Sequence, residues 1–205
     1  PLSAITAKAG LLQSRLSRDD FDTGRARNDV SRILSSADRL VNLISSTLAR
    51  CREESSRIDL RPRRADIAAL VRVAVETNRR DADRKRIALA VSEATEMWSE
   101  VDEGLCLEAI DNLVSNAVKY SPSETEVCVE IESDDHVVRV SVVDQGPGLT
   151  EDDLSRAFRP FQTLSAQPTG GETAPGLGLA HVRQIAEAHG GSVTVESPGK
   201  GQGAP

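Results

Sequence analysis

Two stretches of helical periodicity occupy the first 56 residues. In the first, apolar residues recur at spacings of 3, 4, 3 and 4, the repeat of a helix-bundle seam: Leu2, Ile5, Ala9, Leu12 and Leu16. After a polar break around Gly24, a second apolar stripe runs from Val30 to Leu48. The pattern predicts two helices joined by a short loop, which together form an antiparallel hairpin.

A single hairpin of this kind cannot bury both of its apolar stripes. Pairing with a second copy would close a four-helix bundle, so residues 1–56 are expected to form a homodimer as half of that bundle. The alternative is that the hairpin packs against the rest of its own chain, and the sequence leaves it open. A charged joint with a proline, "RIDLRPRRAD", separates the hairpin from residues 57–205.

Beyond the joint, helical and alternating patterns are mixed. Helical spacing is found over about residues 65–85, in "DNLVSNAVKY" and in "LGLAHVRQIAEAH", where Gly190 provides a C-terminal stop. Strand-like runs are "IALAVSE", "EVCVEIES", "HVVRVSVVD" and "SVTVES", and an Asp-Asp turn divides the second from the third. Helices mixed with largely antiparallel strands predict an α+β fold, a two-layer α/β sandwich, for residues 57–205.

Composition narrows the function classes. Aromatic residues make up only 2% of the 205 residues, so the core is expected to be aliphatic. The net charge of -7 argues against a nucleic-acid partner. No run approaches the roughly 20 apolar residues of a membrane span, so we expect no membrane contact within this chain. The cysteines, Cys51, Cys106 and Cys128, are widely spaced; we expect them to be buried thiols in a cytoplasmic, reducing compartment.

The stretch "DNLVSNAVKYSP" carries the first candidate chemistry. On a helix, Asn112, Asn116 and Lys119 fall within about 60° of one another, opposite an apolar face. The simplest interpretation is a solvated polar face. The functional one is that carboxamide oxygens bind Mg²⁺ while the lysine, one turn on, contacts a phosphate.

Two glycine-bearing stretches follow. In "DQGPGL", Gly146 and Gly148 would let the backbone turn sharply and approach a flat ligand, and Asp144 could accept a hydrogen bond from an exocyclic amine. In "PGLGLA", glycines open a helix, where backbone N–H groups and the positive end of the helix dipole favour phosphate. Taken alone, each stretch is equally compatible with an ordinary turn.

In this fixed order the three stretches resemble the ATP-binding domain of sensor histidine kinases, within the GHKL superfamily that includes gyrase and Hsp90. "NLVSNAVKYSP" resembles the N box, "DQGPGL" the G1 box, "FRPF" the F box and "GLGLA" the G2 box. Residues 1–56 resemble the dimerisation and histidine-phosphotransfer hairpin. The resemblance implies a kinase core that transfers the γ-phosphoryl group of ATP to a histidine and then to a response-regulator aspartate.

The same resemblance implies roles for individual residues. Asn116, with Asn112, would hold Mg²⁺ on the ATP phosphates, which Lys119 and Tyr120 would border. Asp144 would read the adenine amine, and Gly146 and Gly148 would give the base room. The phosphates would be lined by Gly176, Leu177, Gly178 and Leu179. Residues 149–175 would form a mobile lid anchored by Phe158 and Phe161, with Arg156 and Arg159 as candidate phosphate contacts.

The sequence also departs from the family pattern. The family's acceptor motif would place its histidine upstream of Pro1, and we read His136, His181 and His189 as structural or surface residues. We therefore expect a fragment without its acceptor histidine, also lacking the family's final strand, and the full-length protein could be membrane-anchored through an upstream region. Ala174 replaces the first glycine of the usual G2 pattern.

Two rival functions remain at this stage. One is a regulatory nucleotide-binding module, either a degenerate pseudokinase or an anti-sigma-like switch. The other is a hydrolase of the gyrase type, in which a glutamate four residues before the metal asparagine activates water. Asn112 occupies that position here and cannot act as a base at neutral pH, so phosphoryl transfer is favoured over hydrolysis.

Overall fold

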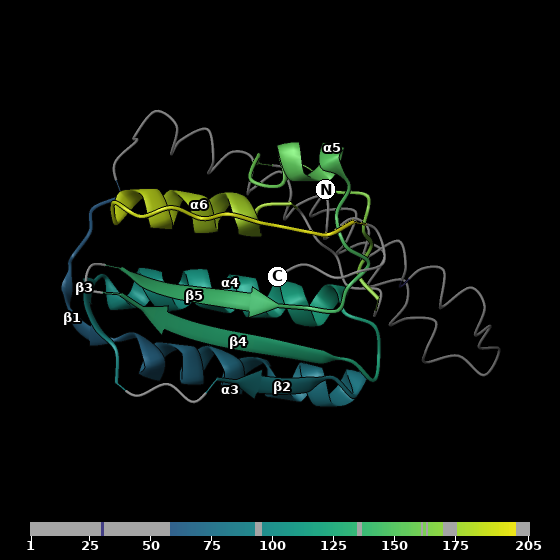
Figure 1. The fold of residues 1–205 in the computed structure, drawn as a ribbon, viewed down its shortest axis with the longest axis horizontal. Coiled ribbons are helices and arrows are strands. Elements are labelled where there is room, and N and C mark those ends of the chain that lie inside the picture. Colours follow the sequence, from purple (N-terminus) through teal and green to yellow (C-terminus); the bar gives the residue numbers. More distant parts are fainter. Residues whose placement is uncertain are drawn as a thin grey trace, which may run out of the picture. The chain divides into compact units, whose positions relative to one another are not determined.

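The computed structural model in Figure 1 describes residues 30, 58–92, 96–134, 137–160, 162, 164–169 and 176–199. The chain divides into two compact units, Pro1–Ser56 and Arg57–Pro205. The hairpin predicted for residues 1–56 lies, except for the helical residue Val30, outside the described residues, and so does the dimer it would form.

The second unit is built on a three-stranded sheet in the order β2-β4-β5. Strand β2 (Ala88–Val91) runs parallel to β4 (Glu126–Ser133), which pairs antiparallel with β5 (Val138–Val143). A separate antiparallel ribbon joins β1 (Arg63–Asp66) to β3 (Trp98–Val101). The helices are α3 (Ile67–Lys85), α4 (Glu103–Tyr120), α5 (Glu151–Arg156) and α6 (Gly178–Ala188).

Helices and sheet form two layers, as Figure 1 shows. Helices α3 and α4 pack against each other and against the sheet, and α6 lies along α4. The core between the layers is aliphatic; its fully buried members include Val71, Val114, Val127 and Val129. The predicted α+β class and two-layer sandwich are confirmed.

Aspartates fix where the two long helices begin. Asp66 caps α3 by accepting a hydrogen bond from the Ala68 backbone N–H at 3.1 Å, and it also accepts one from Met97. Asp102 caps α4 through Leu105 in the same way. The predicted stop of α6 at Gly190 is confirmed, because this glycine has a φ of 75°.

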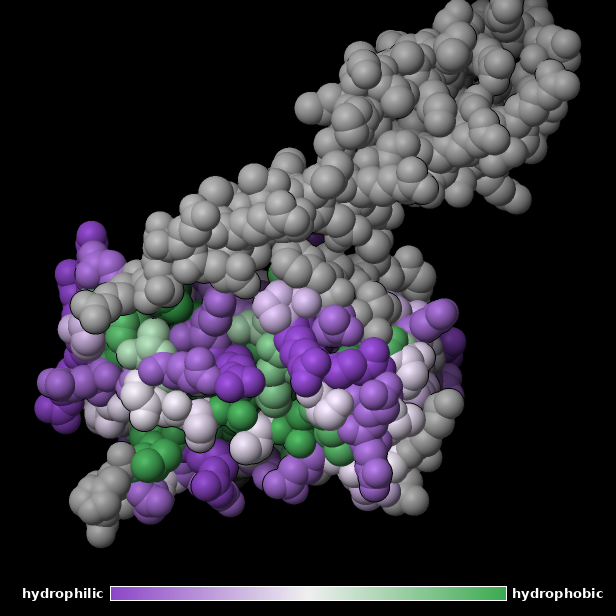
Figure 2. Space-filling model, turned by 90° about the horizontal axis from the view of Figure 1, so that it is seen from above, coloured by the Kyte–Doolittle hydropathy of each residue, from purple (hydrophilic) through white to green (hydrophobic). Residues whose placement is uncertain are grey.

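Hydrophilic and hydrophobic residues are mixed on the surface. On the face shown in Figure 2, the coloured residues are largely hydrophilic and the hydrophobic ones appear in small groups between them. One exposed apolar side chain, Trp98, has the Arg64 guanidinium 5.2 Å from its ring centroid. Within the described part of the chain, no helix has the length and apolar character needed to span a bilayer.

Several sequence predictions were incomplete or wrong. The β1–β3 ribbon and α5 were not predicted, since their short segments lack a clear apolar period. Residues 192–197 were predicted as a strand; they alternate between exposed and half-buried, but the structure gives them no strand pairing. Cys106 and Cys128 are free thiols, half-buried rather than buried.

Candidate functional site

Helix α4 presents the predicted carboxamides toward α6. Asn112 and Asn116 are both half-buried, one turn apart. The Asn112 amide nitrogen donates a hydrogen bond to the Glu108 backbone oxygen at 2.8 Å. This bond fixes the orientation of the carboxamide and turns its oxygen away from the helix backbone.

The start of α6 approaches both carboxamides closely. A Cβ atom added at Gly178 would lie 3.2 Å from the Asn112 Oδ1 atom and 3.3 Å from the Asn116 Nδ2 atom. Leu177, the N-cap of α6, makes no side-chain capping hydrogen bond. The first N–H groups of α6, with the positive end of its dipole, lie at the point where the two asparagines approach it, an arrangement suited to phosphate.

Replacing Gly178 with alanine should disturb this contact selectively. The added methyl group would lie closer to the two carboxamides than nearly all Cβ atoms lie to their neighbours in proteins. At least one carboxamide must therefore move. We expect Gly178→Ala to weaken binding of a magnesium–nucleotide by about tenfold. Thermal unfolding should change little, because alanine favours the helix. Isothermal titration calorimetry with AMPPNP measures the first effect; affinity equal to that of the unchanged chain would contradict the proposed contact.

The loop after β5 carries the next group of predicted site residues. Asp144 accepts a hydrogen bond from the Gly146 N–H at 2.7 Å, and a Cβ on Gly146 would lie 3.4 Å from the Tyr120 backbone oxygen. A side chain at position 146 would therefore crowd the Asp144 carboxylate and the end of α4, while the approach of a ligand to this glycine stays a prediction. Burial raises the pKa of the Tyr120 hydroxyl, which therefore remains a hydrogen-bond donor at neutral pH.

A cavity of about 410 Å³ lies beside this loop. Its lining comes from the loop after β5 and from a segment at residues 164–169, which we call the strap: Pro122, Gln145, Gly146, Pro147, Gly148, Ser165, Ala166, Gln167 and Thr169. Gly148 has a φ of 68°, and a side chain there would collide with the backbone oxygen of Gly199. Both predicted G1 glycines therefore border the cavity.

One end of the strap is hydrogen-bonded to α4 and to Ser121, which follows it. The Thr169 N–H donates a hydrogen bond to the Lys119 backbone oxygen at 3.0 Å, and the Thr169 hydroxyl, with its single proton, lies 3.1 Å from that oxygen and 2.7 Å from the Ser121 oxygen. Nearby, Gly176 has a φ of 71°, and a Cβ there would lie 2.5 Å from the Gln162 backbone oxygen. Of the segment predicted as a lid, Thr169 thus lies against the last turn of the asparagine-bearing helix, and residues 161, 163 and 170–175 lie outside the described residues.

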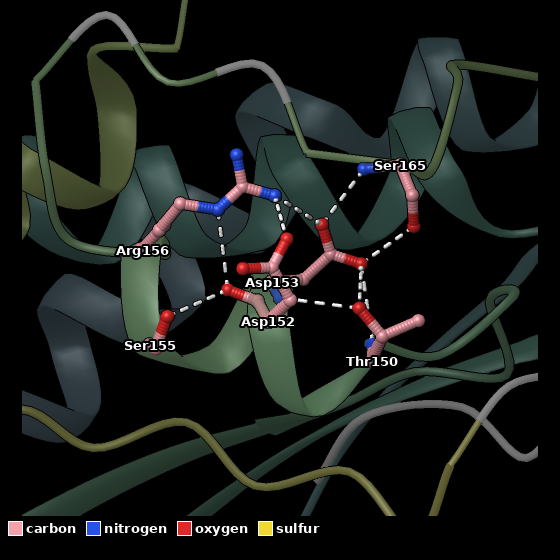
Figure 3. Close-up of polar contacts among 6 residues, drawn as sticks. All are labelled: Thr150, Asp152, Asp153, Ser155, Arg156 and Ser165. Carbon is pink, nitrogen blue, oxygen red and sulfur yellow. Dashed lines mark hydrogen bonds and ion pairs between the residues drawn. The ribbon is translucent and has the colours of Figure 1, made fainter.

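The other end of the strap is hydrogen-bonded to a buried aspartate that the sequence analysis did not identify. Figure 3 shows Asp153, on α5, accepting hydrogen bonds from the backbone and hydroxyl of Ser165 and from those of Thr150. These bonds, the Ser165 hydroxyl foremost, lower the pKa of Asp153 well below its ordinary range. A sequence signal was present, because Thr150-x-x-Asp153 is the spacing of a capping box, which the structure contains.

The positions of the other predicted site residues say less about their function. Leu177 and Leu179 are half-buried at the start of α6, and Phe158 is half-buried just after α5. Phe161, His136 and Ala174 lie outside the described residues. Arg156 pairs with Asp152, and Arg159 is exposed. The backbone oxygen of Lys119 accepts a hydrogen bond from Thr169. Lys119 itself is half-buried in the last turn of α4.

The two described histidines have structural partners. The His181 Nε2 atom lies 3.0 Å from a Glu108 carboxylate oxygen, which links α6 to α4. His189 accepts a hydrogen bond from the Asp102 N–H at 2.9 Å through Nε2, and its Nδ1 atom lies 2.8 Å from the Ile185 oxygen. Neither ring is directed by its contacts toward the asparagines, in agreement with their interpretation as structural residues.

Residues 101–204 match the family model described as histidine kinase-, DNA gyrase B- and HSP90-like ATPase. The chain belongs to this ATPase family. The matched range contains the α4 asparagines, the loop after β5 and the start of α6. The resemblance to sensor histidine kinases is confirmed as well by the relatives.

SenX3 of Mycolicibacterium smegmatis, a sensor-like histidine kinase, is 31% identical over 202 residues, which is 98% of this chain and 52% of SenX3. The chain thus spans about half the length of that relative. Full-length ShkA in complex with AMPPNP is similar in structure, with a TM-score of 0.66 and 30% identity over all of this chain and 44% of ShkA. ThkA in complex with the response regulator protein TrrA has a TM-score of 0.69, covering 98% of this chain and 55% of that one; at 21% identity it supports the fold alone.

Proposed function

We propose that this chain is the kinase core of a two-component sensor histidine kinase. It would bind magnesium–ATP and transfer the γ-phosphoryl group to a histidine, from which a response-regulator aspartate would receive it. The observation that supports this proposal is the close approach of Gly178 to the carboxamides of Asn112 and Asn116, which leaves little room even for a Cβ atom there. It brings a helix N-terminus suited to phosphate together with neutral oxygen ligands.

The residues fit a magnesium ion held jointly with phosphates. Mg²⁺ binds few protein ligands and completes its shell with phosphate oxygens and water, so two carboxamide oxygens suffice. Among the described residues, no group of three or more His, Cys, Asp or Glu side chains could hold a metal unaided. Asn112 and Asn116 would hold the ion, which would neutralise charge on the transferring phosphoryl group.

We propose the remaining roles from the positions of the residues in the fold. Lys119 and Tyr120 would border the phosphates at the end of α4. Asp144 would accept a hydrogen bond from the adenine amine; its Oδ1 already accepts one from Gly146, and a carboxylate has further lone pairs for a second donor. The N–H groups at the start of α6 would orient the phosphates, and the strap would exclude water.

Transfer is favoured over hydrolysis by the state of Asn112. A carboxamide has no basic site at neutral pH, and its nitrogen already donates to the Glu108 oxygen. With no general base for water at this position, catalysis rests on positioning and charge stabilisation, with an imidazole as nucleophile. We propose that the acceptor histidine lies outside residues 1–205, that residues 1–56 dimerise, and that a receiver domain docks on the hairpin.

Peptide mapping tests this proposal. A protein that carries this chain together with the proposed upstream segment is incubated with γ-labelled ATP and Mg²⁺. We expect an acid-labile, base-stable label on a histidine outside residues 1–205, and transfer of that label to a response regulator. Label on His181 or His189 would refute the assignment. Rapid phosphate release without phosphohistidine would instead favour a hydrolase, and nucleotide binding without either would favour the regulatory module.

A further inference from the structure

The last turn of α4 is held by a lysine from another helix. The Lys85 ammonium, at the end of α3, donates hydrogen bonds to the backbone oxygens of Val118 at 2.6 Å and Lys119 at 2.9 Å. These oxygens lie in the last turn of α4, after Ala117, whose oxygen accepts the C-cap N–H of Ser121, and the helix has no further N–H groups to supply to them. A cation at a helix C-terminus is also favoured by the helix dipole.

The position of Lys85 is fixed by its own surroundings. Helix α3 ends immediately after it, where Arg86 takes a left-handed conformation with a φ of 57°. Ile87 is then buried in a cluster that contains Ala117 and Val118 of α4. Because the chain on the C-terminal side of Lys85 packs against the same turn of α4, the backbone at Lys85 is held close to that turn. The Lys85 ammonium is therefore within reach of its carbonyl oxygens.

The strap reaches the same carbonyl. Thr169 donates its N–H to the Lys119 oxygen that Lys85 also contacts. One backbone oxygen is therefore shared by α3, α4 and the strap. The side chains assigned to the phosphates, Lys119 and Tyr120, extend from this turn.

We propose that Lys85 is a positioning residue for the nucleotide site. It holds the last turn of α4 so that the Lys119 and Tyr120 side chains face the nucleotide. It also keeps the Lys119 backbone oxygen in position to accept the hydrogen bond from Thr169. This inference rests on the proposed nucleotide-binding function. Lys85 acts through the α4 backbone and does not itself contact the ligand.

The neighbouring residue provides a matched control. Arg84 lies one position earlier on α3, is exposed, and pairs with Asp81. Lys85→Met and Arg84→Met each remove one positive charge and keep a long apolar side chain. At a temperature at which both variants are fully folded, Lys85→Met should weaken binding of magnesium–AMPPNP by about fivefold, whereas Arg84→Met should leave it unchanged. Lys85→Arg, which keeps a charged donor, should restore most of the affinity.

A spectroscopic readout separates positioning from stability. Tyr120 is the only tyrosine of the chain, so incorporation of 3-fluorotyrosine gives one ¹⁹F resonance, located in the turn that Lys85 holds. We expect Lys85→Met to shift or broaden this resonance in the folded protein and Arg84→Met to leave it in place. Should Lys85→Met not fold, Lys85→Gln, which keeps a neutral donor, is expected to show both effects more weakly.

The outcomes distinguish the two proposals. If the unchanged chain does not bind magnesium–AMPPNP, the proposed function is refuted, and this inference with it. If the unchanged chain binds, Asn116→Ala weakens binding, and Lys85→Met matches Arg84→Met in both affinity and ¹⁹F spectrum, the positioning role alone is refuted.

Discussion

Asn116→Ala should lower the affinity for magnesium–AMPPNP by about 100-fold, because it removes the carboxamide oxygen proposed as the principal metal ligand. The helix itself should persist, since alanine has the higher helix propensity and Asn116 is half-buried on the polar face of α4. Calorimetry gives the affinity, and a thermal melt of the same sample establishes that the fold is unchanged.

Two controls make this result specific. Ser115→Ala, at the adjacent half-buried position of α4, should leave the affinity as it was. Chelation of Mg²⁺ should weaken binding by the unchanged chain strongly and by Asn116→Ala very little, because loss of the ion and loss of its ligand affect one interaction. Equal sensitivity of both proteins to chelation would show that Asn116 does not act through the metal.

Asp153→Asn should lower the free energy of unfolding by about 3 kcal/mol at neutral pH. Asp153 is fully buried and accepts four hydrogen bonds from Thr150 and Ser165. An amide nitrogen in place of one oxygen would face these donors and leave some of them unpaired. Urea unfolding measures the loss. Asp152→Asn, at the exposed neighbouring position that pairs with Arg156, should cost less than about 1 kcal/mol.

The effect of Asp153→Asn should depend on pH in one direction. The hydrogen bonds lower the pKa of Asp153, so its carboxylate stabilises the folded state fully above the unfolded pKa of about 4. As the pH falls from there toward the lowered pKa, that contribution is progressively lost. The difference in unfolding free energy between the unchanged chain and Asp153→Asn should therefore shrink on acidification; a difference that stays constant from pH 7 to pH 3 would contradict the role of the charge.

Long periodic segments could be read directly from the sequence. The strand over Glu126–Ser133 was predicted to the residue, and the helix ending at Lys85 began only two residues later than expected. The apolar alternation and the 3.6-residue period of these segments leave few alternatives. The order of the three boxes likewise predicted that Asn112, Asn116 and Gly178 share one site, although they are distant in sequence.

What the sequence did not reveal depends on tertiary contacts. Strand β1 consists of Arg63–Asp66, and only its pairing with Trp98–Val101 makes it a strand. Residues 192–197 have the alternation of a strand but no partner within the described sheet. Lys85 sits in a helical run as an ordinary surface lysine, and its carbonyl partners lie more than thirty residues away. No local pattern encodes such a contact.

The hydrogen bonds at the two ends of the strap have a consequence for how ligands enter and leave. Only residues 166–168 separate Ser165, bound to Asp153, from Thr169, bound to α4. Because Ser165 and Thr169 are only four Cα–Cα steps apart, they can separate to at most about 14 Å. Outward movement of the strap is therefore expected to require the loss of the hydrogen bonds at one of its ends, to Asp153 or to α4, and the proposed nucleotide would enter or leave the adjoining cavity only after that step.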